Sequence, residues 1–187
     1  MIPASHPFRV HHFGVASPWV DLANSEMWDG FGKLTDFLDD PEWIADFVEY
    51  WHFYVAPPGS AELRELRKLR KLLRHLVGKT SEGPSLRAKD VAQLNEWLKV
   101  PVFRQLVEHQ NGLQLAVAAA QIGWPSVFAS IAASLAESLA NDPHNRLKIC
   151  ANPGCLWVFV DRTKGNVRRW CNDATCGNRD RVRRHRM

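Results

Sequence analysis

The chain has 187 residues, enough for one hydrophobic core and a small additional module. Hydrophobic residues make up 45% of it and charged residues 24%, which excludes a disordered chain. No apolar stretch could span a bilayer, and the N-terminus lacks the basic and apolar regions of a signal peptide, so we expect a cytoplasmic protein without a membrane segment.

The net charge of +4 is unevenly distributed. Residues 144–187 carry eleven Lys and Arg against three Asp, whereas residues 1–143 carry thirteen Lys and Arg against seventeen Asp and Glu. We therefore predict two domains, a neutral-to-acidic domain over residues 1–143 and a basic module over residues 144–187. The charge of the module favours contact with a polyanion.

Helical periodicity predicts a short helix from Trp19 to about Met27 and a second one over residues 31–38. Asp40 and Pro41 are typical of the N-cap and first position of a third helix. This helix carries an aromatic and aliphatic stripe, which we interpret as core, with the wall of a ligand pocket as the alternative. The stripe consists of Trp43, Ile44, Phe47, Val48 and Trp51.

The most regular helix begins at Ser60, and leucines recur along it at helical spacing. Six cations lie between the leucines: Arg64, Arg67, Lys68, Arg70, Lys71 and Arg74. We interpret them as a solvated outer face, and a nucleic-acid-binding face is the alternative.

A further helix after residue 85 should turn Val91, Leu94, Trp97 and Leu98 toward the core and end at Pro101. Residues 102–109 and 113–119 flank Asn111-Gly112, which predicts a two-stranded hairpin. The last helix of this domain begins at Pro125. The N-terminal domain is therefore mostly α-helical with one β-hairpin, and its predicted buried residues are Trp43, Phe47, Trp51, Leu66, Leu73, Trp97, Phe128, Ile131 and Leu135.

All four cysteines lie in the basic module. Cys150 and Cys155 enclose Ala-Asn-Pro-Gly, a turn-forming run that can direct two thiolates to one point. Cys171 and Cys176 have the same spacing, and five residues of helix rotate by about 500°, so these two cannot share a helical face. We therefore expect Cys171 to precede a helix capped by Asn172 or Asp173.

A turn, a strand over residues 156–160 and a helix start are typical of a treble-clef or ribbon-like zinc finger in which four cysteines bind Zn²⁺. Cys150, Cys155, Cys171 and Cys176 are the predicted ligands. Two disulfides are disfavoured in a reducing compartment. An iron–sulfur cluster stays open, because four thiolates suit it as well.

The basic residues of the module are the candidate nucleic-acid contacts. Arginine predominates among them, and its planar fork suits phosphates and guanine edges. The candidates are Lys164, Arg168, Arg169, Arg179, Arg183, Arg184 and Arg186. A frayed, solvated C-terminal tail is the alternative.

The module resembles the bacterial CGNR zinc finger family. The resemblance rests on Cys150-x4-Cys155, Trp157-Val158-Phe159-Val160-Asp161, Arg168-Arg169-Trp170-Cys171 and the motif Cys176-Gly177-Asn178-Arg179. In that family the finger follows a mostly helical domain called ABATE, and members are regarded as candidate stress-induced transcriptional regulators. The resemblance therefore implies DNA binding and transcription regulation in a stress response.

Residues 19–25 are similar to the Asp-Phe-Val-Asn-Thr element of the same family, with Leu22, Ala23 and Ser25 in place of Phe, Val and Thr. Asp21 and Asn24 match it, but the resemblance assigns neither a role.

We find no nucleophile with a base and no phosphate-binding glycine loop, so we do not expect an enzyme. The sequence favours a DNA-binding regulator whose helical domain binds a small-molecule effector or a protein partner. RNA binding stays open, because phosphate contacts are alike for both nucleic acids. A protein-interaction zinc module is a further alternative.

Overall fold

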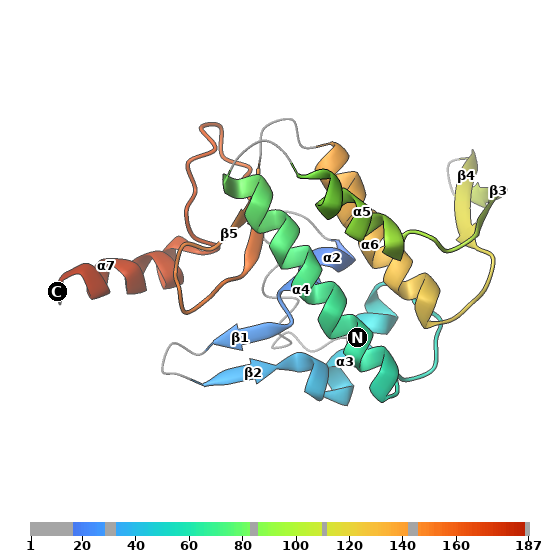
Figure 1. Cartoon of the computed structure of the whole chain (residues 1–187), viewed down its shortest axis with the longest axis horizontal. Coiled ribbons are helices and arrows are strands. Elements are labelled where there is room, and N and C mark those ends of the chain that lie inside the picture. The colour runs from blue at the N-terminus through green and yellow to red at the C-terminus, as the bar shows by residue number, and fades with distance from the viewer. Residues whose placement is uncertain (1–16, 29–32, 83–85, 110–111, 142–145, 186–187) are drawn as a thin grey trace.

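The computed structural model describes residues 17–28, 33–82, 86–109, 112–141 and 146–185. Helices surround one main core, and three separate two-stranded antiparallel sheets lie at its periphery within these residues (Figure 1). None of the helices in these ranges is long and apolar enough to cross a membrane.

The first elements are α2 (Pro18–Ala23), β1 (Glu26–Trp28), β2 (Leu34–Asp36) and a 3₁₀ turn, η1 (Phe37–Asp39). The helix predicted from Trp19 to about Met27 ends at Ala23 instead, because Met27 pairs with Thr35 in the β1–β2 sheet. The prediction of a helix over residues 31–38 is wrong for the part that the structure describes. β2 pairs with β1 instead, and the Asp36 carboxylate accepts a hydrogen bond from the amide of Leu38 at 3.0 Å. Residues 31 and 32 lie outside the described ranges.

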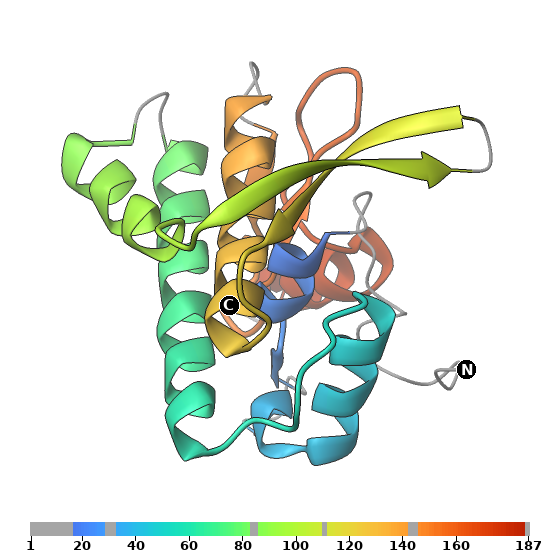
Figure 2. The ribbon, with the colours of Figure 1, turned by 90° about the vertical axis from the view of Figure 1, so that its right-hand side faces the viewer.

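The helices that follow are α3 (Pro41–Tyr50), α4 (Ser60–Glu82), α5 (Ala88–Trp97) and α6 (Trp124–Ala140). Asp40 caps α3 and Pro41 opens it, as predicted. α2 and α6 pack against the long α4, and α5 packs against α6 (Figures 1 and 2).

Seven of the nine predicted core residues are buried: Trp43, Phe47, Leu66, Leu73, Phe128, Ile131 and Leu135. Trp51 and Trp97 are only half-buried, because each lies at the C-terminal end of its helix. Trp51 donates a hydrogen bond to Asp21 at 2.9 Å, and Trp97 packs edge-on against Phe128.

Val91 was predicted to face the core and is exposed instead. The buried apolar position of α5 is Leu94.

The interpretation of all six α4 cations as a solvated face is wrong for Arg70 and Arg74. Arg70 is buried and pairs with Asp36 and Glu26, at 2.6 and 2.9 Å, while Arg74 pairs with Glu26. Arg67 also contacts Asp36, at 3.3 Å. These cations therefore attach the β1–β2 sheet to α4.

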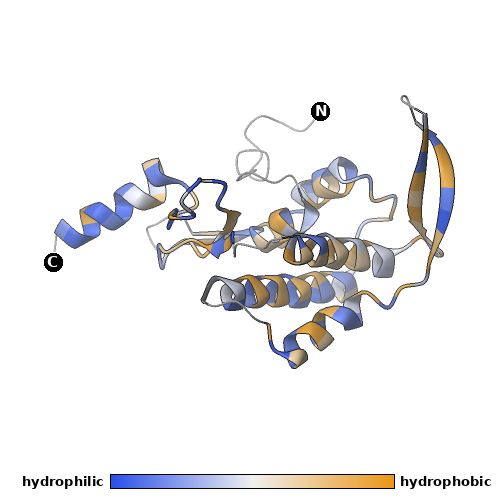
Figure 3. Cartoon of the chain, turned by 90° about the horizontal axis from the view of Figure 1, so that it is seen from above, coloured by the Kyte–Doolittle hydropathy of each residue, from blue (hydrophilic) through white to orange (hydrophobic). Residues whose placement is uncertain are grey.

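The predicted hairpin is confirmed as β3 (Val102–His109) and β4 (Gly112–Ala119). It stands apart from the helices at one end of the molecule (Figure 3).

At the other end lie β5 (Leu147–Ile149), β6 (Val158–Val160), a π-helical turn η2 (Asp173–Gly177) and α7 (Asn178–His185). β5 packs against α4. A Cβ atom at Gly78 of α4 would lie 3.3 Å from Ile149, so a glycine at this position permits the close approach of the two elements.

Candidate metal centre and basic surface

The first two cysteines lie at the ends of a tight turn. The amide of Cys150 donates to the carbonyl of Trp157 at 2.8 Å, continuing the β5–β6 pairing. Within the turn, the Asn152 side chain accepts from the amide of Gly154, and the Asn152 carbonyl accepts from the amide of Cys155. This is the hydrogen bonding expected of an Asn-initiated turn, and it places both thiols on the same side.

The second pair confirms the predicted helix start. Cys171 precedes η2, and the Asn172 side chain caps this turn by accepting from the amide of Thr175 at 3.1 Å. Cys176 lies inside the π-helical turn, whose wider winding brings its sulfur to 3.7 Å from that of Cys171.

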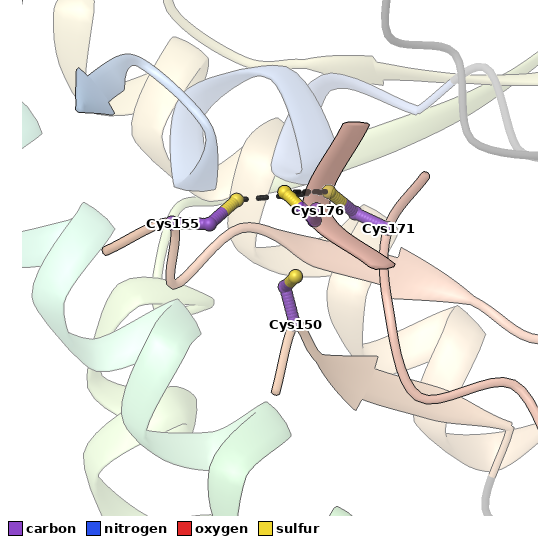
Figure 4. A group of neighbouring side chains, drawn as sticks. All are labelled: Cys150, Cys155, Cys171 and Cys176. Atoms are coloured by element: carbon purple, nitrogen blue, oxygen red, sulfur yellow. Dashed lines mark hydrogen bonds between the residues drawn. The ribbon is translucent and has the colours of Figure 1, made fainter. Parts of the chain in front are cut away.

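All four sulfur atoms lie within 4.8 Å of one another, and all four cysteines are buried. The sulfurs of Cys155 and Cys171 are 3.6 Å apart. Four sulfurs at about 2.3 Å from a tetrahedral zinc ion would be separated by roughly 3.8 Å, so the cluster fits Zn²⁺. The thiols are free, and their separations far exceed the S–S bond of about 2.05 Å, which rules out the two disulfides. Figure 4 shows the side chains directed toward a common centre.

The chemistry of the cluster also favours a cation. Hydrogen bonding with Cys150, then with Cys155, raises the pKa of the Cys171 thiol, and burial raises it further. Without a cation, ionisation of one thiol in this cluster therefore opposes ionisation of Cys171. A bound divalent cation would compensate the negative charges of the thiolates, as in structural zinc sites.

Asp161 organises the loop between the two cysteine pairs. Its buried carboxylate accepts hydrogen bonds from the Lys148 ammonium, from the amide and hydroxyl of Thr163, and from the amide of Arg168. Burial alone would raise the pKa of Asp161, but the bonds from Lys148 and Thr163 outweigh it and hold the pKa well below its usual range. Asp161 therefore acts as an ionised anchor in the finger.

Arg168 is engaged within the finger. Its guanidinium donates to the carbonyls of Trp170 and Cys171 and lies over the ring of Phe159, 5.0 Å from the centroid. The sequence suggested a nucleic-acid contact here, and the contacts within the chain indicate a structural role as well.

The other candidate cations lie at the surface of the finger. Lys164, Arg169 and Arg179 are exposed, and Arg169 lies over the ring of Trp170. Arg183 and Arg184 are also exposed, and both pair with Asp180, which is itself buried. Arg186 lies outside the described residues.

The contacts between the finger and the helical domain were not foreseen from the sequence. The Asn24 side chain donates to the carbonyl of Val158 at 3.0 Å and accepts from its amide at 2.8 Å. Trp157 donates to the carbonyl of Glu26, and Leu147 belongs to the main core. The only sequence signal was the match of Asn24 to the family element.

The two parts of the chain each match a known family. Residues 16–142 match ABATE, described as "Putative stress-induced transcription regulator", and residues 146–187 match the CGNR zinc finger. No curated protein matches the chain. With its four clustered cysteines as the zinc site, the chain therefore belongs to the ABATE family of transcription regulators and carries a C-terminal CGNR zinc finger.

Proposed function

We propose that the protein is a DNA-binding transcriptional regulator that acts in the cytoplasm, has no catalytic activity of its own, and contacts DNA through its zinc finger. The observation that carries this proposal is the exposed, arginine-rich helix α7, which projects from the metal centre away from the helical domain (Figures 1 and 3). The match to a family of transcription regulators supports it.

The metal centre makes α7 suitable for this role. A helix of eight residues with Val182 as its main apolar side chain has little to bury and would be unstable alone. Cys176 lies in η2, which continues directly into α7, so zinc binding would hold the start of the helix. The cations in its last turn also interact favourably with the helix dipole.

Different arginines are proposed to make different contacts. Arg179 lies one residue after the start of α7, directly after the turn that holds Cys176, where zinc binding would hold the backbone in place. We assign it to base recognition. Arg183 is farther along the helix and is assigned to a phosphate, together with Lys164 and Arg169.

The helical domain is proposed to bind an effector. A cavity of about 500 Å³, in the size range of small-molecule sites, lies between α3, the following loop and the start of α4. Its walls are mostly apolar, with Ile44, Val48 and Leu63 among them, and none of the nine predicted core residues lines it. A neutral apolar dye should bind there, and filling the cavity by Ala45→Trp should abolish that binding.

The test of DNA binding is a salt titration of the full chain on a selected and a scrambled duplex. The three phosphate contacts assigned to Lys164, Arg169 and Arg183 predict a slope of log K against log salt near −3. Arg183→Ala should weaken both duplexes alike and flatten the slope by roughly one. Arg179→Ala should reduce the preference for the selected duplex.

Arg64→Ala is the matched control, because this exposed cation lies on α4 in the helical domain. It should change neither affinity nor slope. Salt-independent binding would exclude the phosphate contacts. If the protein bound structured RNA rather than duplex DNA, RNA would replace DNA as the proposed ligand. If it bound another protein and no nucleic acid, that protein would be the proposed ligand. If Arg179→Ala and Arg183→Ala behaved identically, only the assignment of Arg179 to base recognition would be wrong.

A further inference from the structure

The β3–β4 hairpin has large apolar side chains that no element of the described chain covers. Leu106, Leu113, Leu115 and Val117 are 62–69% exposed. An isolated two-stranded hairpin is marginally stable in water and needs an apolar face packed against something else. Here the ribbon stands clear of the helices over most of its length (Figures 2 and 3).

The strand register sorts these side chains onto one face. Leu106 lies opposite Leu115, Arg104 opposite Val117, and Glu108 opposite Leu113. Because side chains alternate along a strand, the even positions of β3 and the odd positions of β4 share one surface. We call it the hairpin face: Val102, Arg104, Leu106, Glu108, Leu113, Leu115, Val117 and Ala119.

The charges of the hairpin face are arranged symmetrically about its centre. Arg104 and Glu108 each lie two residues from Leu106. Four residues along a strand separate them by about 14 Å, too far to form a salt bridge within one copy. A two-fold axis that runs across the strands at Leu106 would bring Arg104 of one copy opposite Glu108 of the other.

The same axis matches the apolar residues. It would place the Leu106–Leu115 pair of one copy on that of the other, and Val117 of one copy on Leu113 of the other. From this agreement of charge and apolar pattern we propose that the hairpin face binds a second copy of this chain, forming a two-fold symmetric dimer. A two-fold interface requires such a self-complementary surface.

The ribbon alone is too small for a stable interface. Two strands of eight residues present a face of roughly 27 by 10 Å, or about 540 Å² for both copies. Specific interfaces usually bury more than about 1,000 Å². Further contact is available at the base of the hairpin, where a groove of about 310 Å³ separates Val102 and Val117 from the small residues Ala129 and Ala133 of α6. The Leu113 end of the second hairpin would lie at the mouth of this groove.

The modest area predicts a dimer that dissociates in the micromolar to millimolar range. We would measure the mass of the full-length, zinc-loaded protein by sedimentation equilibrium from about 10 μM to 1 mM, which spans weak association constants. Leu106→Asp should give a monomer over this whole range. Gln105→Asp is the matched control, because it adds the same charge at the neighbouring position on the opposite face, and it should leave the dimer intact.

A charge exchange tests the symmetry itself. Arg104→Glu and Glu108→Arg should each weaken the dimer about tenfold or more by placing like charges opposite each other. The double variant should restore most of the wild-type association, and far-UV circular dichroism should be unchanged in all of them. A wild-type protein that is monomeric up to 1 mM would overturn the proposal and leave the hairpin face for a different protein. Dimerisation that persists after Leu106→Asp would also overturn the proposal. So would a double variant that associates no more tightly than the two single variants.

Discussion

Buried polar side chains hold together segments of this protein that are far apart in the sequence. Asn24 and Val158 are separated by 134 residues and exchange two hydrogen bonds in a buried environment. Asp21, three residues earlier, receives a hydrogen bond from Trp51. Both residues match the family element near the N-terminus, and the structure gives each of them a physical role.

Replacing Asn24 by Ala should destabilise the folded protein by about 2–4 kcal/mol, because it leaves the amide and carbonyl of Val158 buried without partners. Urea unfolding followed by circular dichroism measures this. Asn95→Ala is the matched control, since Asn95 is exposed on α5, and it should change the unfolding free energy little. Equal losses of unfolding free energy in Asn24→Ala and Asn95→Ala would contradict a stabilising role of the hydrogen bonds between Asn24 and Val158.

Asp21 makes stability depend on pH. Burial raises the pKa of its carboxyl to about 8 in the folded protein, although the hydrogen bond from Trp51 opposes the shift. The unfolded chain releases this proton near pH 4, so between about pH 4 and pH 8 the folded state binds more protons. The contribution of Asp21 to the unfolding free energy is therefore largest at low pH and is lost as the pH rises toward 8.

Asp21→Asn keeps an uncharged acceptor for Trp51 and removes the titration. Relative to wild type, the variant should gain stability between pH 5 and pH 8, by up to about 4 kcal/mol. Urea midpoints at both pH values measure the difference. Asp40→Asn replaces an exposed N-cap with another good N-cap and should show no such gain. A constant difference between Asp21→Asn and wild type across this range would rule out the titration of Asp21.

At the scale of elements, α4 is both the centre of the core and the attachment site of the β1–β2 sheet. Its leucines Leu66, Leu69, Leu73 and Leu76 are buried, and Arg70 lies on the same helix with its guanidinium between Asp36 and Glu26. Burial would raise the pKa of Asp36, but the hydrogen bond from Arg70 contributes to lowering it. Charge pairing therefore orients this small sheet.

Arg70→Ala should destabilise the protein by about 3–5 kcal/mol, because Asp36 and Glu26 would lose a buried counterion. Lys71→Ala is the control, since this exposed neighbour lies on the same helix and makes the same change in net charge. The measurement is the free energy of unfolding in urea. Similar losses of unfolding free energy in Arg70→Ala and Lys71→Ala would show that the net charge of α4, rather than the buried contacts of Arg70, contributes to stability.

At the scale of the whole molecule, the finger and the helical domain are coupled. The sequence predicts two domains, over residues 1–143 and 144–187, but residues of the finger contribute to the main core. The cysteines pack with Trp157 and Phe159, whereas Leu147 and Val158 belong to the main core. The finger therefore cannot unfold without exposing part of the helical domain.

Removing zinc should lower the melting temperature of the helical signal by roughly 10 °C or more, because burial of Leu147 and Val158 is lost. Circular dichroism with and without a chelator measures this, and elemental analysis should find one zinc per chain. Cys171→Ser should melt at the lowered temperature without chelator and respond no further to it. An unchanged melting temperature of the helices would show that the finger unfolds independently.

The hairpin face and α7 lie at opposite ends of the molecule (Figure 1). A dimer formed through the hairpins would therefore carry its two fingers at its outer ends. This separation would let both fingers remain accessible while the helical domains associate.

Local signals in the sequence determined the cysteine ligands, the Asn172 cap, the Asn111-Gly112 hairpin and most of the buried stripe. These features depend on spacing within one helix, strand or turn, and that spacing is visible in a single chain. Tertiary structure alone decided that residues 34–36 pair as a strand, that Arg70 is buried, and that Asn24 binds Val158. Such choices depend on contacts between segments that are far apart in the sequence. The local pattern is the same whether a side chain faces solvent or a buried partner, so the pattern alone does not identify the contact.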